Sequence, residues 1–244
     1  MNSITREEVK EFVNQHISEF HKSRINRVKK IKLREILQKK NPYLFKAKNI
    51  LTAQSLIESL LQAYLSSSEE ELFGEFLEEL SIFIASRTLN GRKSPGSGID
   101  LEFTRGGVVY LVSIKSGINW GNSSQYAALR DKFKKAVQVL KQSKSVNAVQ
   151  PVLASCYGKR KTINNGEYLR ICGQEFWYFI SDNKNLYTEI IEPLGHKAKQ
   201  HNQNYEEELA AVINKFTAEF SNEFCHDGKI DWSELVRFNS GNIK

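Results

Sequence analysis

The sequence has few cysteines, and their arrangement suggests neither a cross-link nor a metal site. Only three occur among the 244 residues, Cys156, Cys172 and Cys225, and no two of them form a CxxC pair. An odd number of widely separated thiols is typical of a reducing compartment. The five histidines also lack zinc-type spacing, both with one another and with the cysteines. We therefore predict a cytoplasmic protein without a structural zinc site.

Long hydrophobic runs and the common nucleotide-binding motifs are missing as well. No apolar stretch approaches the roughly 18–20 residues that a membrane span requires. The N-terminal segment MNSITREEVKEF contains acids instead of the apolar core of a signal peptide. The phosphate-binding patterns GxxxxGKS/T and GxGxxG and the serine-hydrolase pattern GxSxG are absent. These absences argue against membrane insertion, secretion, nucleotide binding and serine hydrolysis.

Charge is distributed unevenly along the chain. The net charge is +7, from 35 Lys and Arg against 28 Asp and Glu. Eleven basic residues and one acid, Glu35, lie between residues 22 and 48, whereas residues 204–236 carry eight acids and two lysines. A basic excess suits a polyanionic partner. The basic segment is either a solvated helix face or an arm that contacts the phosphates of a nucleic acid, and the sequence leaves both interpretations open.

Helical spacing dominates the first third of the chain. Apolar residues recur every three to four positions within residues 1–40, and a second helix is predicted over 52–65. The run SSSEE, residues 66–70, has hydroxyl groups followed by acids, which is typical of a helix N-terminus. We therefore predict that a separate amphipathic helix begins there and spans 69–87.

The pattern then changes to alternation. Residues 99–104 and 108–115 are rich in β-branched and aromatic residues, and the turn Arg105-Gly106-Gly107 joins them, which predicts a β-hairpin. The elements predicted after the hairpin are a helix over 124–143 capped by Ser123-Ser124, strands near 150–157 and 167–172, and a helix that begins at Gly173.

Nothing in the composition divides the chain into separate parts. It contains no Pro- or Gly-rich linker, no internal repeat and no low-complexity segment. We therefore predict one domain over 1–244, in which an α/β core (69–182) lies between a helical, basic N-terminal part (1–68) and a helical C-terminal part (183–244).

Two charged residues stand at the ends of the predicted hairpin strands. Asp100 lies on the first strand, and Lys115 closes the second, whose sequence VVYLVSIK is mostly apolar. Alternation places Lys115 on the same strand face as Leu111 and Ser113. A carboxylate on the paired strand would offset the cost of an ammonium group beside apolar layers. The two residues form either a plain cross-strand ion pair or part of a catalytic site, and spacing alone does not decide between them.

The segment that these residues bound, SGID…VSIKSG, resembles the motif of the PD-(D/E)xK nucleases. Within them it is most similar to Type II restriction endonucleases, and SIKSGINWGNSSQ (113–125) is the most specific part. A looser resemblance runs through FGEFLEE and GQEFWYFI to enzymes that cut interrupted palindromes with G·C-rich half-sites. The resemblance implies an α/β fold with a restriction-endonuclease-like core, a mixed sheet of about four to five strands flanked by helices, with extra N- and C-terminal helices.

The same resemblance implies Mg²⁺-dependent hydrolysis of double-stranded DNA that leaves 5′-phosphate and 3′-hydroxyl ends. Mg²⁺ prefers carboxylate and carbonyl oxygens. Asp100 would be its fixed ligand, and the main-chain carbonyl of Ile114 a further one. Lys115 would orient or help to deprotonate the attacking water and offset the charge that develops on the phosphoryl oxygens.

The chain departs from the family motif at Ser113, where a second acid is expected. A serine is a poorer Mg²⁺ ligand than a carboxylate, so another acid must supply the charge. The candidates are Glu102 on the first hairpin strand and Glu75, Glu78 or Glu79 on the preceding helix. At about 100° per residue, Glu79 lies nearest the apolar stripe of that helix and Glu78 points furthest away. We therefore predict Glu79 as a catalytic residue and metal ligand, with Glu102 second.

Residues suited to DNA contact follow two of the core strands. The predicted DNA-binding residues are Asn119, Trp120, Asn122, Ser123 and Gln125 after the hairpin, and Lys159, Arg160 and Lys161 after the next strand. Amide and guanidinium groups of this kind read base edges. Trp120 is equally suited to packing, and the basic loop to simple solvation, so these alternatives stay open.

The predicted partner is double-stranded DNA. Because a palindromic target favours a two-fold dimer, we expect a homodimer. A cognate DNA methyltransferase would act on the same DNA site without direct binding. Two alternatives remain. A structure-specific junction or repair nuclease would share the core but is usually smaller, and a non-catalytic DNA-binding module on a degenerate nuclease core would explain Ser113.

Overall fold

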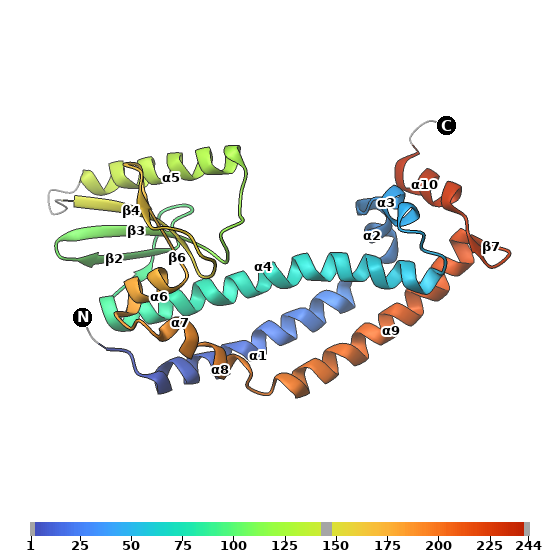
Figure 1. The fold of residues 1–244 in the computed structure, drawn as a ribbon, viewed down its shortest axis with the longest axis horizontal. Coiled ribbons are helices and arrows are strands. Elements are labelled where there is room, and N and C mark those ends of the chain that lie inside the picture. The colour runs from blue at the N-terminus through green and yellow to red at the C-terminus, as the bar shows by residue number, and fades with distance from the viewer. Residues whose placement is uncertain (1–2, 143–147, 242–244) are drawn as a thin grey trace. The chain divides into compact units, whose positions relative to one another are not determined.

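The chain forms two compact units. The structure, a computed structural model, describes residues 3–142 and 148–241 (Figure 1). The sheet unit comprises Met1–Ile17 and Phe73–His196, and the helical unit comprises Ser18–Leu72 and Lys197–Lys244. The single domain expected from the sequence stays a prediction, because compactness does not test whether the two units fold separately.

A six-stranded mixed sheet forms the centre of the sheet unit (Figure 1). The strands are β1 (Arg92–Lys93), β2 (Leu101–Arg105), β3 (Val108–Lys115), β4 (Ala148–Ser155), β5 (Ile163–Asn164) and β6 (Leu169–Cys172). Their order is β1-β2-β3-β4-β6-β5, with β3, β4 and β6 parallel and the other pairs antiparallel. The α/β class is confirmed, but the sheet has more strands than the four to five expected. The extra strands β1 and β5 have two residues each, too few to produce an alternating pattern.

The predicted hairpin is confirmed as β2 and β3. Leu101 pairs with Val112, and Arg105 pairs with Val108 at the turn. Gly106 and Gly107 both have positive φ, 59° and 78°. Two consecutive left-handed residues give a turn whose twist matches that of the strands, and glycine adopts this backbone without strain. The local sequence therefore fixes the register that positions the ends of both strands.

Helices cover both faces of the sheet. On one face, α5 (Ser123–Lys141) buries Leu129 and Phe133 against Leu111 and Leu153. The other face packs against α6 (Gln174–Ser181) through the rings of Phe103, Tyr110 and Phe179. The unit is completed by the first part of α1 (Arg6–Lys30), the last part of α4 (Ala53–Leu89), α7 (Leu186–Glu189) and α8 (Ile191–Leu194).

The predicted cap of α5 is wrong by one residue. The side chain of Asn122, not of Ser123 or Ser124, accepts the N–H of Gln125 at 3.1 Å, and the Gln125 side chain accepts the N–H of Asn122 in return. This reciprocal pattern is a capping box, and it satisfies two backbone donors at the helix start. The predicted end of this helix, residue 143, lies outside the described residues.

The helical unit consists of helices around their own apolar core. Besides the remaining parts of α1 and α4, it contains α2 (Leu33–Lys39), α3 (Pro42–Ala47), α9 (Ala198–Phe224), α10 (Trp232–Ser240) and the short hairpin of β7 (Cys225–His226) and β8 (Lys229–Ile230). Leu56, Leu61, Phe216, Phe220 and Phe224 are among its buried core residues. None of the helices in the described part of the chain has the length and apolarity that crossing a membrane would require.

The helix start predicted at residues 66–70 is wrong, because α4 continues unbroken from Ala53 to Leu89. Ser67 Oγ bonds back to the carbonyl of Ala63 (3.5 Å), and Leu65 and Ser68 are buried. Serines in a helix interior can satisfy their hydroxyl groups in this way. Tertiary packing of this stretch therefore outweighs its local preference for a cap.

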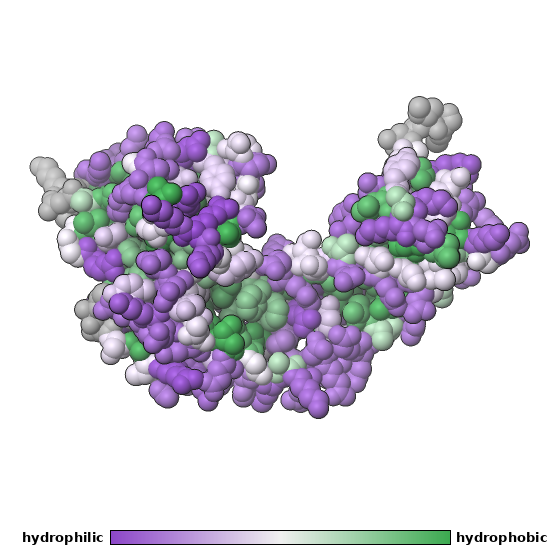
Figure 2. Space-filling model, viewed as in Figure 1, coloured by the Kyte–Doolittle hydropathy of each residue, from purple (hydrophilic) through white to green (hydrophobic). Residues whose placement is uncertain are grey.

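Several basic residues of the segment 22–48 form ion pairs with acids that lie far away in the sequence but in the same unit. The ion pairs are Arg24–Glu69 (2.7 Å), Arg27–Glu71 (3.4 Å), Lys29–Glu208 (2.7 Å) and Arg34–Glu223. Arg24 is only 13% exposed, and its guanidinium lies 3.8 Å from the ring centre of Tyr205. Hydrophilic residues also cover the start of α9 (Figure 2). Neither open interpretation fits Arg24, whose charge serves the packing of the unit.

Candidate active site

The end of the β2–β3 hairpin brings Asp100 and Lys115 together. The N–H of Asp100 donates to the carbonyl of Val112 at 2.9 Å, which extends the hairpin by one residue before β2. Lys115 Nζ lies 4.0 Å from Asp100 Oδ2, and the two side chains are 31% and 18% exposed, respectively. The two residues singled out in the sequence therefore lie at ion-pair distance and remain accessible to a ligand.

Two donors hold the Asp100 carboxylate in place. The N–H of Ile114 donates to Oδ2 at 2.6 Å, and Ser113 Oγ lies 3.3 Å from the same oxygen. Because Leu101 pairs with Val112, Asp100 stands opposite Ser113 across the two strands, and Ser113 is fully buried. Directly opposed residues share one face of a sheet. The serine that replaces the expected acid thus orients Asp100 and adds no charge of its own.

The predicted orientation of the acids on α4 is wrong, whereas the role predicted for Glu79 is not tested by it. Glu78 is partly buried, with 28% of its side chain exposed, whereas Glu75 and Glu79 are exposed. The buried face of α4 includes the small or polar residues Ser81, Ala85 and Thr88 beside the large apolar ones. When these residues are included, the centre of the buried face lies roughly 80° around the helix axis from the centre of the apolar stripe. This offset moves Glu79 away from the sheet and places Glu78 at the edge of the buried face.

The electrostatics of Glu78 tie it to Asp100. Burial raises the pKa of the Glu78 carboxyl above its usual value, and the negative charge of Asp100 raises it further. The positive charges of Lys93 and Lys115 act in the opposite direction, and Lys93 Nζ lies 3.6 Å from Glu78 Oε1. Two carboxylates that disfavour each other's charge are stabilised when a further cation enters between them.

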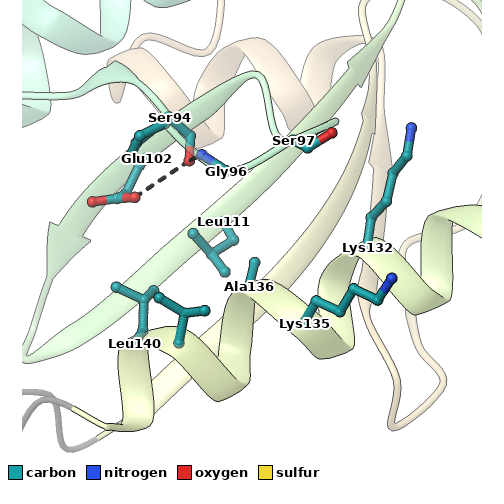
Figure 3. A pocket seen from close by; sticks show the side chains of 11 residues that line it. Ser94, Gly96, Ser97, Glu102, Leu111, Lys132, Lys135, Ala136 and Leu140 are labelled. Atoms are coloured by element: carbon teal, nitrogen blue, oxygen red, sulfur yellow. Dashed lines mark hydrogen bonds between the residues drawn. The ribbon is translucent and has the colours of Figure 1, made fainter.

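Glu102, the second candidate from the sequence, is held elsewhere. Its carboxylate forms an ion pair with Arg92 at 2.9 Å and accepts a hydrogen bond from Ser94 at 3.4 Å. It lines a cavity of about 510 Å³ between the loop after β1, the hairpin and α5. Figure 3 shows this cavity, with the apolar side chains of Leu111 and Leu140 beside Glu102. Neither Asp100 nor Lys115 is among the residues that line it.

The donors beside Asp100 suit a hard divalent cation. Among residues 3–142 and 148–241, no group of three or more His, Cys, Asp or Glu side chains forms a ready-made metal cluster. What the site offers is the two carboxylates of Asp100 and Glu78 and the main chain of Ile114, whose N–H already contacts Asp100. Mg²⁺ is commonly held by one or two carboxylates and keeps several waters. The residues present therefore fit Mg²⁺ better than a softer metal.

The two predicted DNA-contact segments meet beside this site. Arg160 donates to Asn119 Oδ1 at 3.5 Å, which joins the loop after β3 to the loop after β4. Lys115 Nζ lies 5.4 Å from the ring centre of Trp120, and that ring packs on Tyr126 at 4.7 Å. Trp120 thus packs on α5 while it also contacts the candidate catalytic lysine.

The remaining residues predicted to contact DNA differ in whether their polar groups are already hydrogen-bonded within the protein. Lys159 and Lys161 are exposed, and so is Ser123. Asn122 and Gln125 are exposed too, but their side-chain oxygens are engaged in the capping box of α5. Their first role is therefore structural, and only the remaining donor groups are available to a ligand.

Sequence reasoning missed Arg170 and ranked Glu78 last among the acids of α4. Arg170 lies on β6 and lines a small pocket together with Arg160, Lys161 and Trp120. Its Nε is buried and has no hydrogen-bond partner among the described residues. An arginine inside the short apolar strand LRIC was the available signal, because a charge there needs a partner.

Comparison with known proteins identifies a family. A family profile described as Type II restriction endonuclease EcoO109I matches residues 7–202. No curated protein sequence is similar enough to the chain to count as a match. The matched range includes every residue of the site described above, among them Glu78, Asp100, Lys115 and Arg170. Since the match covers most of the chain, this protein belongs to the family of the Type II restriction endonuclease EcoO109I.

Proposed function

We propose that the protein is a Type II restriction endonuclease that uses Mg²⁺ to hydrolyse double-stranded DNA within a specific sequence, leaving 5′-phosphate and 3′-hydroxyl ends. Family membership supports DNA as the substrate and a restriction activity. The observation that carries the rest is the contact of Asp100 with Lys115, with Glu78 as a second acid beside them. Paired acids and an adjacent cation are the groups that metal-assisted phosphodiester hydrolysis uses.

Asp100, Glu78 and the Ile114 carbonyl are the groups that would hold Mg²⁺. When bound, Mg²⁺ supplies Lewis-acid stabilisation of the negative charge that develops on the phosphoryl oxygens. The N–H of Ile114 and the hydroxyl of Ser113 keep the Asp100 carboxylate oriented, so little reorganisation is needed on binding. Glu78 replaces Glu79 in this role. Glu102 remains the alternative acid, although Arg92 and Ser94 already hold it.

Lys115 is the group that acts on the attacking water. Its ammonium stands 4.0 Å from Asp100 and is partly exposed, so it reaches both the carboxylate and solvent. From there it orients the water and offsets the charge that builds up on phosphorus oxygens. Trp120 beneath the ammonium limits its freedom and keeps it near the hairpin end.

DNA contacts come from the loops after β3 and β4. Asn119 and Arg160 offer amide and guanidinium donors for base edges, and Lys159 and Lys161 offer charges for phosphates. The structure brings these segments side by side through the Arg160–Asn119 contact. Trp120, Asn122, Ser123 and Gln125 border the same region and complete the proposed interface.

A palindromic target would be read by two copies of the chain related by two-fold symmetry, so we propose a homodimer. A cognate DNA methyltransferase would protect the same DNA sequence without binding to this protein. Size-exclusion chromatography with light scattering tests the dimer directly, since a monomer at working concentration would contradict it.

Digestion of a long DNA of mixed sequence in the presence of Mg²⁺ tests the function. Discrete fragments, with ends that a ligase joins only while their 5′-phosphates are kept, would support the proposal. A smear would favour a nuclease without sequence preference, and cutting confined to branched DNA would favour a structure-specific enzyme. Binding without any cutting would favour a non-catalytic module, for which Ser113 in place of an acid is the motivating observation.

A further inference from the structure

The short edge strand β1 contacts both acids that flank Asp100. Arg92 forms an ion pair with Glu102 at 2.9 Å, and Lys93 forms one with Glu78 at 3.6 Å. The two cations are neighbours in sequence and therefore point to opposite faces of the sheet. In this arrangement Glu102 and Glu78 each have a cation from β1 nearby.

The Lys93–Glu78 pair cannot coexist unchanged with a metal on Glu78. A divalent cation bound to this carboxylate would lie within a few ångströms of the Lys93 ammonium, where like charges repel strongly. The Lys93 side chain is 74% exposed and Glu78 is 28% exposed. Lys93 can therefore swing into solvent at little cost, while Glu78 stays fixed on α4.

We infer that Lys93 is a counter-ion that Mg²⁺ displaces from Glu78 and that, once displaced, contacts the DNA backbone next to the cleaved bond. The inference rests on the proposed function, because it requires a metal at Asp100 and Glu78. DNA bound at this site would place phosphates of the same strand on either side of Asp100, since each strand carries one phosphate per about 3.4 Å of helix axis. Metal binding and DNA binding are then coupled through one lysine.

The location of Lys93 supports this exchange of partners. Lys93 belongs to a two-residue strand whose backbone pairs with Leu101, one residue after Asp100. The backbone that carries the lysine is thus fixed beside the site, while its four-carbon side chain is free to turn. On the opposite face, Arg92 is held at the shorter distance of 2.9 Å by Glu102, which lines the cavity of Figure 3. Arg92 is therefore a matched control on the same strand.

Calorimetric titration with Mg²⁺ alone, without DNA, tests the first half of the inference. Lys93→Gln removes the competing cation from an exposed residue and should bind Mg²⁺ about two- to fivefold more tightly than wild type, the range expected for one exposed ion pair. Arg92→Gln should bind Mg²⁺ like wild type. If Lys93→Gln binds Mg²⁺ no more tightly, or if Arg92→Gln shows the gain instead, the inference is wrong.

DNA binding tests the second half of the inference, the contact of the displaced Lys93 with the DNA backbone. Here Lys93→Gln should weaken binding when Mg²⁺ is present, whereas it should strengthen the binding of Mg²⁺ itself. The Lys115→Ala background prevents cutting, and a linear fragment that the wild-type protein cuts serves as the probe. Without divalent ions, adding Lys93→Gln should leave DNA affinity unchanged, because Glu78 still holds the lysine. With Mg²⁺, Lys93→Gln should weaken binding and lower the slope of log affinity against log salt by about one unit.

An equal loss of DNA affinity with and without Mg²⁺ would make Lys93 an ordinary phosphate contact and overturn the coupling. Asp100→Asn separates this failure from failure of the proposed function. If wild type binds no Mg²⁺, or if Asp100→Asn binds it equally well, the metal site itself is wrong and the inference falls with it. If Asp100→Asn loses Mg²⁺ binding while Lys93→Gln has no effect, the proposed function stands and only the role of Lys93 is refuted.

Discussion

The candidate site of the sheet unit and the ion pairs of the helical unit use charge in different ways. In the helical unit, Arg24 and Lys29 meet Glu69 and Glu208 at 2.7 Å, so opposite charges from distant parts of the chain neutralise each other. In the sheet unit, two acids share one site, and their cations stand further off, at 3.6 Å from Glu78 and 4.0 Å from Asp100. The first arrangement satisfies its charges within the fold, and the second leaves negative charge available to a ligand.

This difference shows why a basic stretch in a sequence is weak evidence for DNA binding. The segment 22–48 has eleven basic residues against one acid, which is the strongest charge signal in the chain. Its partners, among them Glu208 and Glu223, lie far away in sequence on α9. Function is better sought where charge is incompletely paired, because natural folds usually leave such conflicts at functional sites.

The largest effect that follows from this comparison concerns Asp100 and Lys115. Asp100→Ala and Lys115→Ala should each reduce Mg²⁺-dependent DNA cleavage by at least about 10³-fold, because both groups act on the reacting phosphate. DNA affinity without divalent ions should stay within about tenfold of wild type, since most of it comes from other phosphate contacts. Plasmid digestion and fluorescence anisotropy measure the two quantities. A variant that cuts at nearly the wild-type rate would refute the assignment of the active site.

A smaller loss should separate the two neighbouring acids of α4. Glu78→Gln keeps the shape of the side chain and removes its charge, so cleavage should fall by about 10²-fold, a loss of roughly 3 kcal/mol in transition-state stabilisation. Glu79→Gln, on the exposed side of the helix, should cleave like wild type. Thermal unfolding checks that both variants fold equally well. Normal cleavage by Glu78→Gln together with a defect in Glu102→Gln would move the second acid to β2.

The hairpin was predictable because its signals are local. Alternating residues and the glycines 106 and 107 specify two strands, their turn and their register without reference to the rest of the chain. The same holds for α5, β4 and β6, whose bounds in the structure lie within about two residues of those predicted. The contact of Asp100 with Lys115 follows from this register, so the centre of the candidate site was accessible from sequence.

The remaining features depend on tertiary packing. Which acid of α4 lies at the edge of the buried face depends on how the helix is rotated, and this rotation buries Ser81 and Thr88 although neither belongs to the apolar stripe. The continuity of α4 through Ser66–Ser68 depends likewise on the burial of Leu65. The neutralisation of Arg24 by Glu69 joins residues 45 positions apart. No local pattern encodes these contacts.

The helical side of the comparison can be tested at Arg24. Arg24→Met removes a charge that is 13% exposed and leaves Glu69 without its partner, so the free energy of unfolding should fall by about 2–3 kcal/mol. The salt dependence of DNA binding should not change, because this guanidinium is already occupied. Denaturant unfolding and anisotropy titrations at several salt concentrations measure these effects. Lys30→Met, at an exposed position of the same helix, should leave stability unchanged. A lower salt slope for Arg24→Met would return this segment to the DNA interface.

The corresponding change in the sheet unit should have the opposite signature. Lys159→Gln and Lys161→Gln remove exposed charges from the loop after β4, and each should weaken DNA binding several-fold and lower the salt slope by about one unit. Stability should stay within about 0.5 kcal/mol of wild type. Lys199→Gln, an equally exposed lysine on α9, is the control from the helical unit and should change neither quantity. If Lys199→Gln weakens DNA binding as much as the loop variants do, the loop after β4 contributes no more to DNA binding than an exposed lysine of the helical unit.

The smallest effect concerns the pH dependence of the helical unit. The pKa of His21 is lowered to about 4, chiefly by burial and further by the charges of the stacked His201 and of Arg24, while Glu69 opposes them. Unfolding returns this group to a pKa near 6.5. Below that pH the unfolded chain takes up a proton that the folded chain excludes, so stability is full above about pH 6.5 and declines as the pH falls toward 4. From pH 7 to 5.5 the expected loss is about 1 kcal/mol.

His21→Phe isolates this contribution, because a phenyl ring preserves the stack on His201 and does not titrate. Denaturant unfolding of wild type and variant at both pH values should show a smaller acid-induced loss in the variant, and the difference between the two losses reports on His21 alone. Hydrogen exchange adds the spatial test, since amides of α9 around His201 should become less protected at pH 5.5 in wild type, whereas those of β3 should change less. Equal pH dependence of wild type and His21→Phe would mean that His21 takes up its proton as readily in the folded as in the unfolded protein, so that it is charged in the folded protein at pH 5.5. The stacked pair of His21 and His201 would then carry a positive charge without a matching partner inside the helical unit. The contrast between that unit and the active site, where charge is incompletely paired, would no longer hold.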